Sequence, residues 1–435
     1  MISPIIAFFY VFNEMGFNEA LIQESHIHDS MLSSVFWLNL LIGIVLTFIA
    51  IVLAPIISKF YGIDSLKLVV IVLSFNLVLS ATRTVHQAIF MKSMNFKTLS
   101  IIEVASTSFA GLLAVILALN GWGYWSLVIQ NIAANFVNTA ILWILSDWRP
   151  SFIYSWKDIK QLFYFSNNVT IFKIINYIAR NIDYILIGKF LGAQSLGYYT
   201  LAYKIMLYPI QNLSQVVSKV LFPSLVEIKE NLDRFKSNFL NALKYIGVVS
   251  FPVMTLLIIM GPLFIETVFG QKWSTTGVII QILALVGLKQ SITSPLGVLF
   301  LSKGKPNIQM KLSLVTTIFT TLAIIIGLRW GVVGVATGYT FMGLLLFYPE
   351  VFITFRVADL KVRDFFSNFK SELISSVTMI LIILILKIIL QQVEINNWIL
   401  IVMIPVLGFL VFYIVMWLID KVFIKKVYKL LTDLI

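Results

Sequence analysis

Long apolar segments dominate this sequence and leave few folds open to it. A helix needs about 20 apolar residues to cross the hydrocarbon core of a bilayer, and twelve segments of the chain approach or exceed that length. They are residues 34–57, 66–91, 99–119, 124–145, 163–189, 196–221, 239–268, 277–301, 312–328, 332–355, 373–390 and 398–418. Residues 1–12 form a further apolar stretch that is too short to cross alone. The sequence therefore predicts an all-α polytopic membrane protein.

The composition excludes several other classes of protein. Of the 435 residues, 59% are hydrophobic and 12% are charged, whereas soluble domains carry about 25% charged residues. The chain contains no cysteine, so disulfides and cysteine-based metal sites are excluded. We find no P-loop, no HExxH motif and no GxSxG motif, and we expect neither a catalytic site nor a cofactor.

The distribution of basic residues predicts how the spans are oriented. If 1–12 runs inward, most lysines and arginines outside the spans fall in the loops 146–162, 226–238 and 356–372 and in the C-terminal tail. The opposite loops hold only Lys59, Lys67, Lys189, Lys272 and Arg329. Basic residues collect in cytoplasmic loops, so the first set is cytoplasmic and the net charge of +12 needs no nucleic acid to explain it. The short opposite loops leave no room for a catalytic domain outside the membrane.

A weak internal repeat suggests two related bundles. Residues 66–104 resemble residues 275–315 in pattern, with SLKLVVIVLSFNLVL matching STTGVIIQILALVGL. Transporters built from such repeats bind substrate where the two halves meet. The counterpart of residues 163–192 would fall before Met1, so we expect the first helix and part of the second to be missing. The domains expected are 1–150, a bundle truncated at its start; 151–360, a second bundle; and 361–435, two further helices with a basic cytoplasmic tail.

Charged residues inside the spans are the candidate functional groups. Basic residues occupy span interiors at Arg83, Lys173, Arg180, Lys204 and Lys289, and acidic residues at Glu103, Asp183 and Glu350. A charge at the bilayer centre costs at least ~2.5–3.5 kcal/mol, so such groups face a protein interior or a water-filled cavity. The positive excess predicts a cationic cavity for an anionic ligand such as a diphosphate.

Two acidic residues leave alternatives open. Asp183 lies three residues after Arg180, a spacing at which the two side chains can form an ion pair. That pair is either a structural lock between helices or part of the cavity. Glu103 either neutralises Arg83 or carries a coupling proton or sodium ion.

Several segments resemble a known family. They include NEMGFNEALIQ, RTVHQAIFMKSMNFKTLSIIEV, VLFPSL and FGQKW, and the most specific is RNIDYILIGKFLGAQSLGYYTLAYKIMLYPIQN. Over residues 1 to about 360 the chain resembles the polysaccharide flippases (Wzx-type lipopolysaccharide and capsule biosynthesis proteins) of the MOP superfamily. The resemblance implies two pseudo-repeated six-helix bundles around a central cavity plus two C-terminal helices. It also implies that undecaprenyl-diphosphate-linked oligosaccharide moves from the inner to the outer leaflet of the bacterial cytoplasmic membrane by alternating access.

The same resemblance implies the partners: a lipid-linked oligosaccharide, membrane lipids, a coupling H⁺ or Na⁺, and other polysaccharide-assembly proteins. Two alternatives remain. A multidrug or cation antiporter of the same superfamily would need an acidic cavity, whereas the charges here are mainly basic. A membrane oligosaccharide polymerase or ligase would need a large outside loop, which the expected topology lacks.

Overall fold

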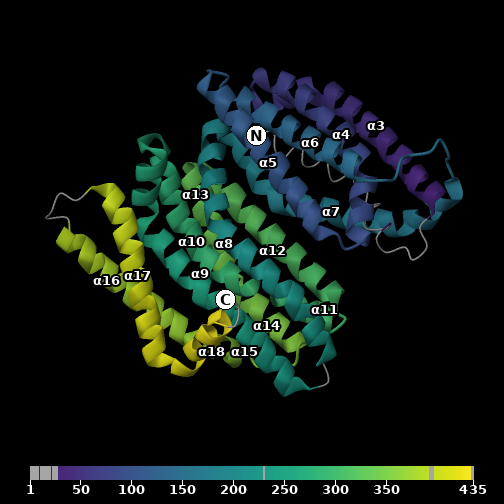
Figure 1. The fold of residues 1–435 in the computed structure, drawn as a ribbon. Helices are drawn as coiled ribbons and strands as arrows, with labels where there is room; N and C mark the ends of the chain where they lie inside the picture. Colours follow the sequence, from purple (N-terminus) through teal and green to yellow (C-terminus); the bar gives the residue numbers. More distant parts are fainter. Residues whose placement is uncertain (1–8, 10–20, 22–27, 229–230, 391–395, 433–435) are drawn as a thin grey trace. The chain divides into compact units, whose positions relative to one another are not determined.

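The fold consists of helices throughout the part of the chain that the structure describes. The computed structural model describes residues 9, 21, 28–228, 231–390 and 396–432, apart from the side chains of most residues in 161–179 and 213–226 and of residues 306, 390 and 427–432. Every described element is a helix (Figure 1). The helices divide into two compact units, residues 1–189 and residues 190–435.

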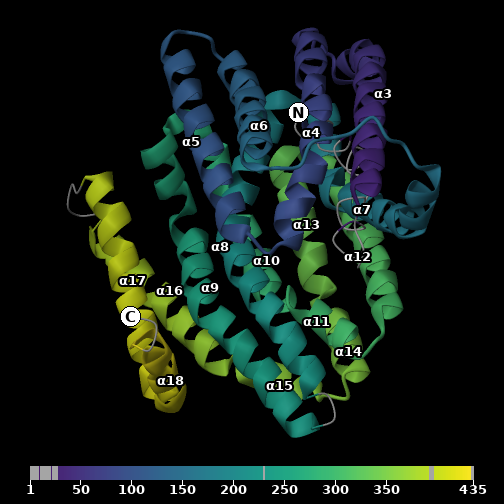
Figure 2. The same ribbon diagram turned by 45° about the vertical axis from the view of Figure 1, so that its right-hand side comes forward.

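The first unit is built from long helices joined by short turns. It contains α3 (Asp29–Tyr61), α4 (Ser65–Lys92), α5 (Phe96–Leu119), α6 (Trp125–Leu145) and nearly all of α7 (Trp156–Phe190). Helix α3 ends at Gly62, whose φ of 67° suits the left-handed cap that glycine adopts readily. Helix α5 begins where the Asn95 side chain accepts a hydrogen bond from the Thr98 N–H. Helix α4 packs against α3 and α6, and α5 forms a hairpin with α6 (Figure 2).

An aromatic cluster forms one core of this unit. The Phe36 ring meets Trp143 and Trp148 edge to face, with ring centroids 5.9 and 6.1 Å apart. His86 is buried against the same two indoles, with its ring 4.6 Å from that of Trp143. These contacts fix the C-terminal half of α4 against α6 and the segment that follows it.

The second unit contains the remaining helices. They are α8 (Gly192–Glu227), α9 (Leu232–Phe269), α10 (Ser274–Thr293), α11 (Leu296–Ser302), α12 (Pro306–Gly327), α13 (Gly331–Leu345), α14 (Phe347–Val357), α15 (Val362–Asn368), α16 (Lys370–Leu390), α17 (Asn397–Ile419) and α18 (Lys421–Thr432). Helix α9 packs against α8, α10, α16 and α17, and Figures 1 and 2 show the last two beside it. Pro295 separates α10 from α11, because proline cannot donate the next helical hydrogen bond.

Glycines let two helices of this unit approach closely. A Cβ at Gly334 in α13 would lie 2.4 Å from the backbone oxygen of Gly327 in α12. A Cβ at Gly338 would lie 2.5 Å from the backbone oxygen of Ala323. Small residues permit such contacts between helices in a bilayer, where apolar burial drives association weakly.

All twelve spans expected from the sequence lie, to within one residue at their ends, inside a helix or inside a pair of helices separated by a short break. Nine described helical stretches are long and apolar enough to cross a membrane by length and composition. Large apolar side chains such as Leu112, Ile144 and Ile388 are more than half exposed, as expected where lipid is the solvent. The missing first helix concerns a region of which only Phe9 and Leu21 are described, so it stays a prediction. The boundary expected at residue 150 was drawn from the internal repeat and stays a prediction. The contacts within the chain place nearly all of α7 in the first unit, which ends at residue 189.

Candidate functional site

Three helices of the first unit present polar side chains to one another. Helix α6 carries Asn131, Asn135 and Asn138, whose spacing of four and three residues puts them on one face. Helix α5 contributes Glu103 and Ser106, which share a face for the same reason. Because α6 packs against both α4 and α5, the asparagines lie between the other two helices.

Arg83 of α4 binds this row of amides. Its Nη1 donates to Oδ1 of Asn135 at 3.3 Å and to Oδ1 of Asn138 at 3.5 Å. The Nδ2 of Asn138 donates in turn to Glu103 Oε2 at 3.1 Å and to Ser106 Oγ at 3.5 Å. The amide of Asn138 therefore turns its oxygen to the cation and its nitrogen to the anion. Arg83 and Glu103, both described, are joined through this one amide and form no direct ion pair, and the two alternative roles of Glu103 stay predictions.

The amide row continues away from Arg83. Asn76 of α4 donates from Nδ2 to Asn131 Oδ1 of α6 at 3.0 Å. This contact lies two helical turns from the contact between Arg83 and Asn138. Asn76 and Arg83 are seven residues apart, as are Asn131 and Asn138, so the α4–α6 seam repeats with that period. We call the set Asn76, Arg83, Asn131, Asn135, Asn138 and Glu103 the amide seam.

A second polar cluster lies in the second unit. Lys289 of α10 forms an ion pair with Glu350 of α14, with Nζ 2.5 Å from Oε2. The adjacent Gln290 donates from Nε2 to the Tyr339 hydroxyl of α13 at 2.7 Å. That hydroxyl lies 3.5 Å from the hydroxyl of Tyr203 of α8, whose ring stacks on Tyr199 with centroids 5.9 Å apart. The cluster therefore joins four helices through polar and aromatic side chains.

The remaining predicted site residues differ in their exposure. Arg180 is exposed on α7, and Asp183 is buried one turn later. Within the described structure the two form no ion pair, and Asp183 Oδ1 accepts a hydrogen bond from the Tyr184 N–H at 2.9 Å. Lys204 is exposed on α8, and no described carboxylate pairs with it. The side chain of Lys173 lies outside the described residues.

Sequence reasoning missed most of the partners in these clusters. The asparagines of α6 were visible as an i, i+4, i+7 pattern in an apolar span, but uncharged amides did not stand out beside lysines and arginines. Gln290, Tyr203 and Tyr339 come from three helices, and no short-range pattern connects them. Glu372 was also missed; it is fully buried on α16.

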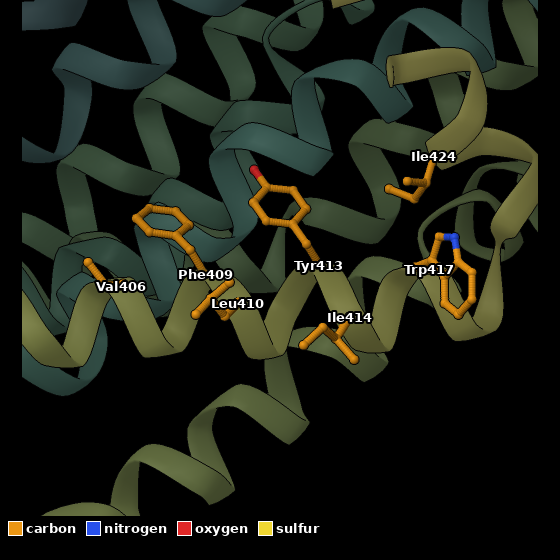
Figure 3. Close-up of a pocket in the computed structure, with 7 residues that line it drawn as sticks. All are labelled: Val406, Phe409, Leu410, Tyr413, Ile414, Trp417 and Ile424. Atoms are coloured by element: carbon orange, nitrogen blue, oxygen red, sulfur yellow. The ribbon is translucent and has the colours of Figure 1, made fainter. Parts of the chain in front are cut away.

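Other kinds of site find little support. No group of three histidine or acidic side chains in the described part of the chain is placed to hold a metal ion. A pocket of about 510 Å³ lies along α17 (Figure 3). Its lining is apolar except for the Tyr413 hydroxyl and the Trp417 nitrogen, and it consists of Val406, Phe409, Leu410, Tyr413, Ile414, Trp417 and Ile424. Such a surface suits acyl chains rather than a charged ligand.

Comparison with known proteins gives these clusters a context. The family described as "Polysaccharide biosynthesis protein" matches residues 1–278. The chain is 31% identical over 299 residues to the teichuronic acid biosynthesis protein TuaB of Bacillus subtilis, covering 68% of this chain and 62% of that protein. It is 27% identical over 348 residues to the lipopolysaccharide biosynthesis protein WzxC of Escherichia coli, covering 78% of this chain and 70% of that protein. The match thus spans less than two thirds of the first of these relatives.

Solved structures show the same fold at low sequence identity. The lipid II flippase MurJ in an inward closed conformation superposes with a TM-score of 0.74 at 19% identity, covering 96% of this chain and 91% of that one. An inward-facing multidrug transporter of the MATE family of the MOP superfamily gives a TM-score of 0.61 at 13% identity, covering 82% and 89%. The protein is therefore a multi-pass membrane protein with a MurJ- and MATE-like fold, and it belongs to the polysaccharide biosynthesis protein family.

Proposed function

We propose that this protein is a flippase that moves an undecaprenyl-diphosphate-linked oligosaccharide from the inner to the outer leaflet of the bacterial cytoplasmic membrane. The observation that carries the proposal is the excess of basic residues in the interiors of the spans. It is made in a chain that belongs to a polysaccharide biosynthesis family and has a fold shared with transporters. A diphosphate carries about two negative charges, and arginine and lysine bind phosphate strongly in sites that exclude water. Alternating access by two bundles related by the internal repeat is part of the same proposal.

The cationic residues have separate roles in this mechanism. Arg180 and Lys204 are exposed, so they are available to contact the diphosphate without breaking an ion pair. Arg83 and Lys289 already have partners, and they reach the substrate only by exchanging Asn138 or Glu350 for phosphate oxygens. Lys173 is assigned to the same substrate site from its place in the sequence. Glu103 and Asp183 are assigned to charge pairing or to binding of a coupling H⁺ or Na⁺.

The alternatives require different chemistry. A multidrug or cation antiporter would bind cationic ligands, and exposed arginine and lysine side chains repel them. A polymerase or ligase would need catalytic groups in an outside loop, and the described outside loops are short turns such as 120–124 and 62–64. A transporter of an anionic lipid agrees best with both observations.

A reconstituted system tests the proposal directly. Purified protein in proteoliposomes would be given an undecaprenyl-diphosphate-linked oligosaccharide with a fluorescent sugar, and transbilayer movement would be read by protection from an impermeant quencher. We expect the protein to move the diphosphate-linked lipid across the bilayer. It should move the corresponding lipid-linked monophosphate more slowly. Arg180→Ala and Lys204→Ala should each slow movement at unchanged protein yield. Arg180→Lys keeps the positive charge but lacks the planar guanidinium fork, so it should recover only part of the rate.

The matched controls are Arg329→Ala and Lys272→Ala. Both residues are exposed near the opposite ends of spans and outside the expected cavity, so these variants should move substrate at the wild-type rate. Rates for Arg180→Ala and Lys204→Ala that equal those of the controls would remove both residues from the site. Movement of a cationic drug but of no lipid-linked sugar would favour the antiporter instead.

A further inference from the structure

Helix α8 has one buried face and one exposed face. Tyr199, Ala202 and Met206 are fully buried in the second unit, where α8 packs against α9, α10 and α13. Within residues 192–212, where the structure describes every side chain, the exposed residues are Ala193, Gln194, Lys204, Tyr208, Gln211 and Asn212. The exposed face of this part of the helix therefore carries no large aliphatic side chain.

Helix α16 of the same unit has an exposed face of a different kind. It carries Ile374, Val377 and Leu381, which are 40%, 56% and 56% exposed. Aliphatic side chains of this kind suit contact with acyl chains, whereas polar side chains are costly in the hydrocarbon core. The composition of the exposed face of α8 therefore indicates contact with water or with a polar ligand.

The polar residues of α8 lie at the depth of the hydrocarbon core. The expected span begins at residue 196, so Lys204 and Asn212 lie about 12 and about 24 Å into a core about 30 Å thick. Polar residues at this depth that are not packed in protein line a water-filled cavity. We call Lys204, Tyr208, Gln211 and Asn212 the polar face of α8.

The residues of the polar face follow one side of the helix. Lys204, Tyr208 and Gln211 are spaced by four and three residues, and Asn212 lies one turn after Tyr208. Tyr208 is 73% exposed. Asn212 donates from Nδ2 to the Tyr208 carbonyl oxygen at 2.9 Å, a bond that does not use its Oδ1 atom. The face therefore presents an ammonium group, an aromatic ring and two carboxamides in a row.

A proline adds a backbone acceptor to the same part of α8. Pro209 has no N–H, so the carbonyl oxygen of Ile205 lacks the hydrogen bond that it would accept in a regular helix. Inside a membrane, a carbonyl released in this way must be satisfied by a neighbouring group, by water or by a ligand. Ile205 lies between Lys204 and Tyr208 in the sequence, within one turn of both.

These groups fit a sugar better than they fit other ligands in a membrane. Carboxamides both donate and accept hydrogen bonds, as the hydroxyls of a sugar do. A tyrosine ring offers a flat apolar surface with a polar tip, and this surface matches the apolar C–H face of a sugar ring. Residues 192–212 include no acidic residue, which disfavours a cationic ligand. One lysine without an arginine is a weak set of ligands for a diphosphate alone.

We propose that the polar face of α8 binds the saccharide of the transported lipid. The Tyr208 ring stacks on a sugar ring, and the carboxamides of Gln211 and Asn212 form hydrogen bonds with its hydroxyls. The inference rests on the proposed function, which places Lys204 at the diphosphate. Tyr208, Gln211 and Asn212 follow Lys204 toward the cytoplasmic end of α8, so the sugars extend from the diphosphate toward the cytoplasm before transport.

Binding of two lipids by the purified full chain tests the inference. Native mass spectrometry gives dissociation constants for the lipid-linked oligosaccharide extracted from the strain that encodes the protein and for undecaprenyl diphosphate, which lacks the sugar. Wild type should bind the oligosaccharide lipid about tenfold more tightly. Tyr208→Leu keeps an apolar side chain but removes the ring, so this preference should fall about fivefold. Tyr208→Phe should retain the preference, and both variants should bind undecaprenyl diphosphate as wild type does.

Two asparagines supply a matched pair of variants. Asn212→Leu removes a carboxamide from the polar face and should also lower the preference for the oligosaccharide lipid. Asn120, at the end of α5, is likewise exposed and donates from Nδ2 to the carbonyl oxygen four residues earlier. Asn120→Leu should therefore leave the preference at its wild-type value.

The possible results separate this inference from the proposed function. If wild type prefers the oligosaccharide lipid and Tyr208→Leu and Asn212→Leu retain that preference, the inference is overturned and the proposed function stands. The same conclusion follows if wild type binds both lipids equally, or if Tyr208→Leu weakens binding of both lipids to the same extent. If wild type binds neither lipid, the proposed function is contradicted and the inference is overturned with it.

Discussion

The ion pair between Lys289 and Glu350 offers a sharp test of the polar cluster in the second unit. Glu350→Gln keeps the size of the side chain and removes its charge, which leaves the Lys289 ammonium without a partner. The Lys289 and Glu350 side chains are 13% and 21% exposed, so water can replace the lost carboxylate only partly. The substitution should therefore destabilise the protein.

The magnitude follows from this burial. Removing one partner of a buried ion pair costs ~3–5 kcal/mol, and the partial exposure places this pair near ~3 kcal/mol. Removing both charges, as Lys289→Met with Glu350→Gln, should recover most of that loss, because no charge is then stranded. The coupling energy in the double-mutant cycle should therefore reach about 2 kcal/mol, at the upper part of the range for residues in contact.

Unfolding in mixed micelles of increasing SDS fraction measures these free energies. The matched control is the pair formed by Lys303 and Asp359, whose charged atoms are 3.9 Å apart and whose aspartate is 75% exposed. Asp359→Asn should cost no more than ~0.5 kcal/mol, since exposed ion pairs contribute little. Asparagine also tolerates the positive φ of 58° at this position. If Glu350→Gln cost no more than Asp359→Asn, or if the double variant were additive, the reasoning would be refuted.

Three further outcomes are expected. Gly334→Ala should destabilise the protein by ~1–3 kcal/mol, because its Cβ would lie 2.4 Å from a backbone oxygen. The control Gly111→Ala has open space around the new Cβ and should leave stability unchanged, and SDS unfolding measures both variants. Burial raises the pKa of Asp420, but hydrogen bonds from Lys244 and the Phe423 N–H and the nearby lysine charges lower it overall. The carboxylate of Asp420 therefore stabilises the protein at pH values above the ordinary aspartate pKa of about 3.9, and this stabilisation is lost as the pH falls through the lower pKa of the folded state. Asp420→Asn should lower Tm at pH 7, and its Tm should fall less steeply than that of wild type below pH 4. A cysteine at Lys157 should be shielded from an impermeant thiol reagent in intact cells and one at Gln194 should react, with the reverse pattern contradicting the orientation.

The helices were predictable because lipid imposes a simple demand. A span must be long, apolar and fully hydrogen-bonded within itself, so each span could be located from length and hydropathy alone. The breaks were marked by prolines: Pro295 separates α10 from α11, and Pro349 cannot donate to the carbonyl of Leu345, where α13 ends. Helix packing through Gly327 and Gly334 depends on backbone contact that no side chain reports.

The candidate sites were predictable in part. Charged residues in spans were conspicuous, and the link from Glu103 to Arg83 was among the alternatives, but its path through the Asn138 amide was not. Arg180 and Asp183 have a spacing that permits an ion pair, and the structure instead buries Asp183 and exposes Arg180. Spacing along a helix states which residues are near, while rotamers and neighbouring helices decide which of them meet.

The unequal lengths of the helices have a consequence for the lipids that suit this protein. At 1.5 Å per residue, the 38 residues of α9 extend about 57 Å, well beyond a hydrocarbon core of about 30 Å. Helices α6 and α16, with 21 residues each, extend only about 32 Å. In a thicker bilayer α9 still spans the hydrocarbon core, but the polar ends of α6 and α16 would lie among the acyl chains. Such hydrophobic mismatch is resolved by thinning of the bilayer or by tilting of helices. The two short helices, one in each unit, therefore set the membrane thickness that the protein matches.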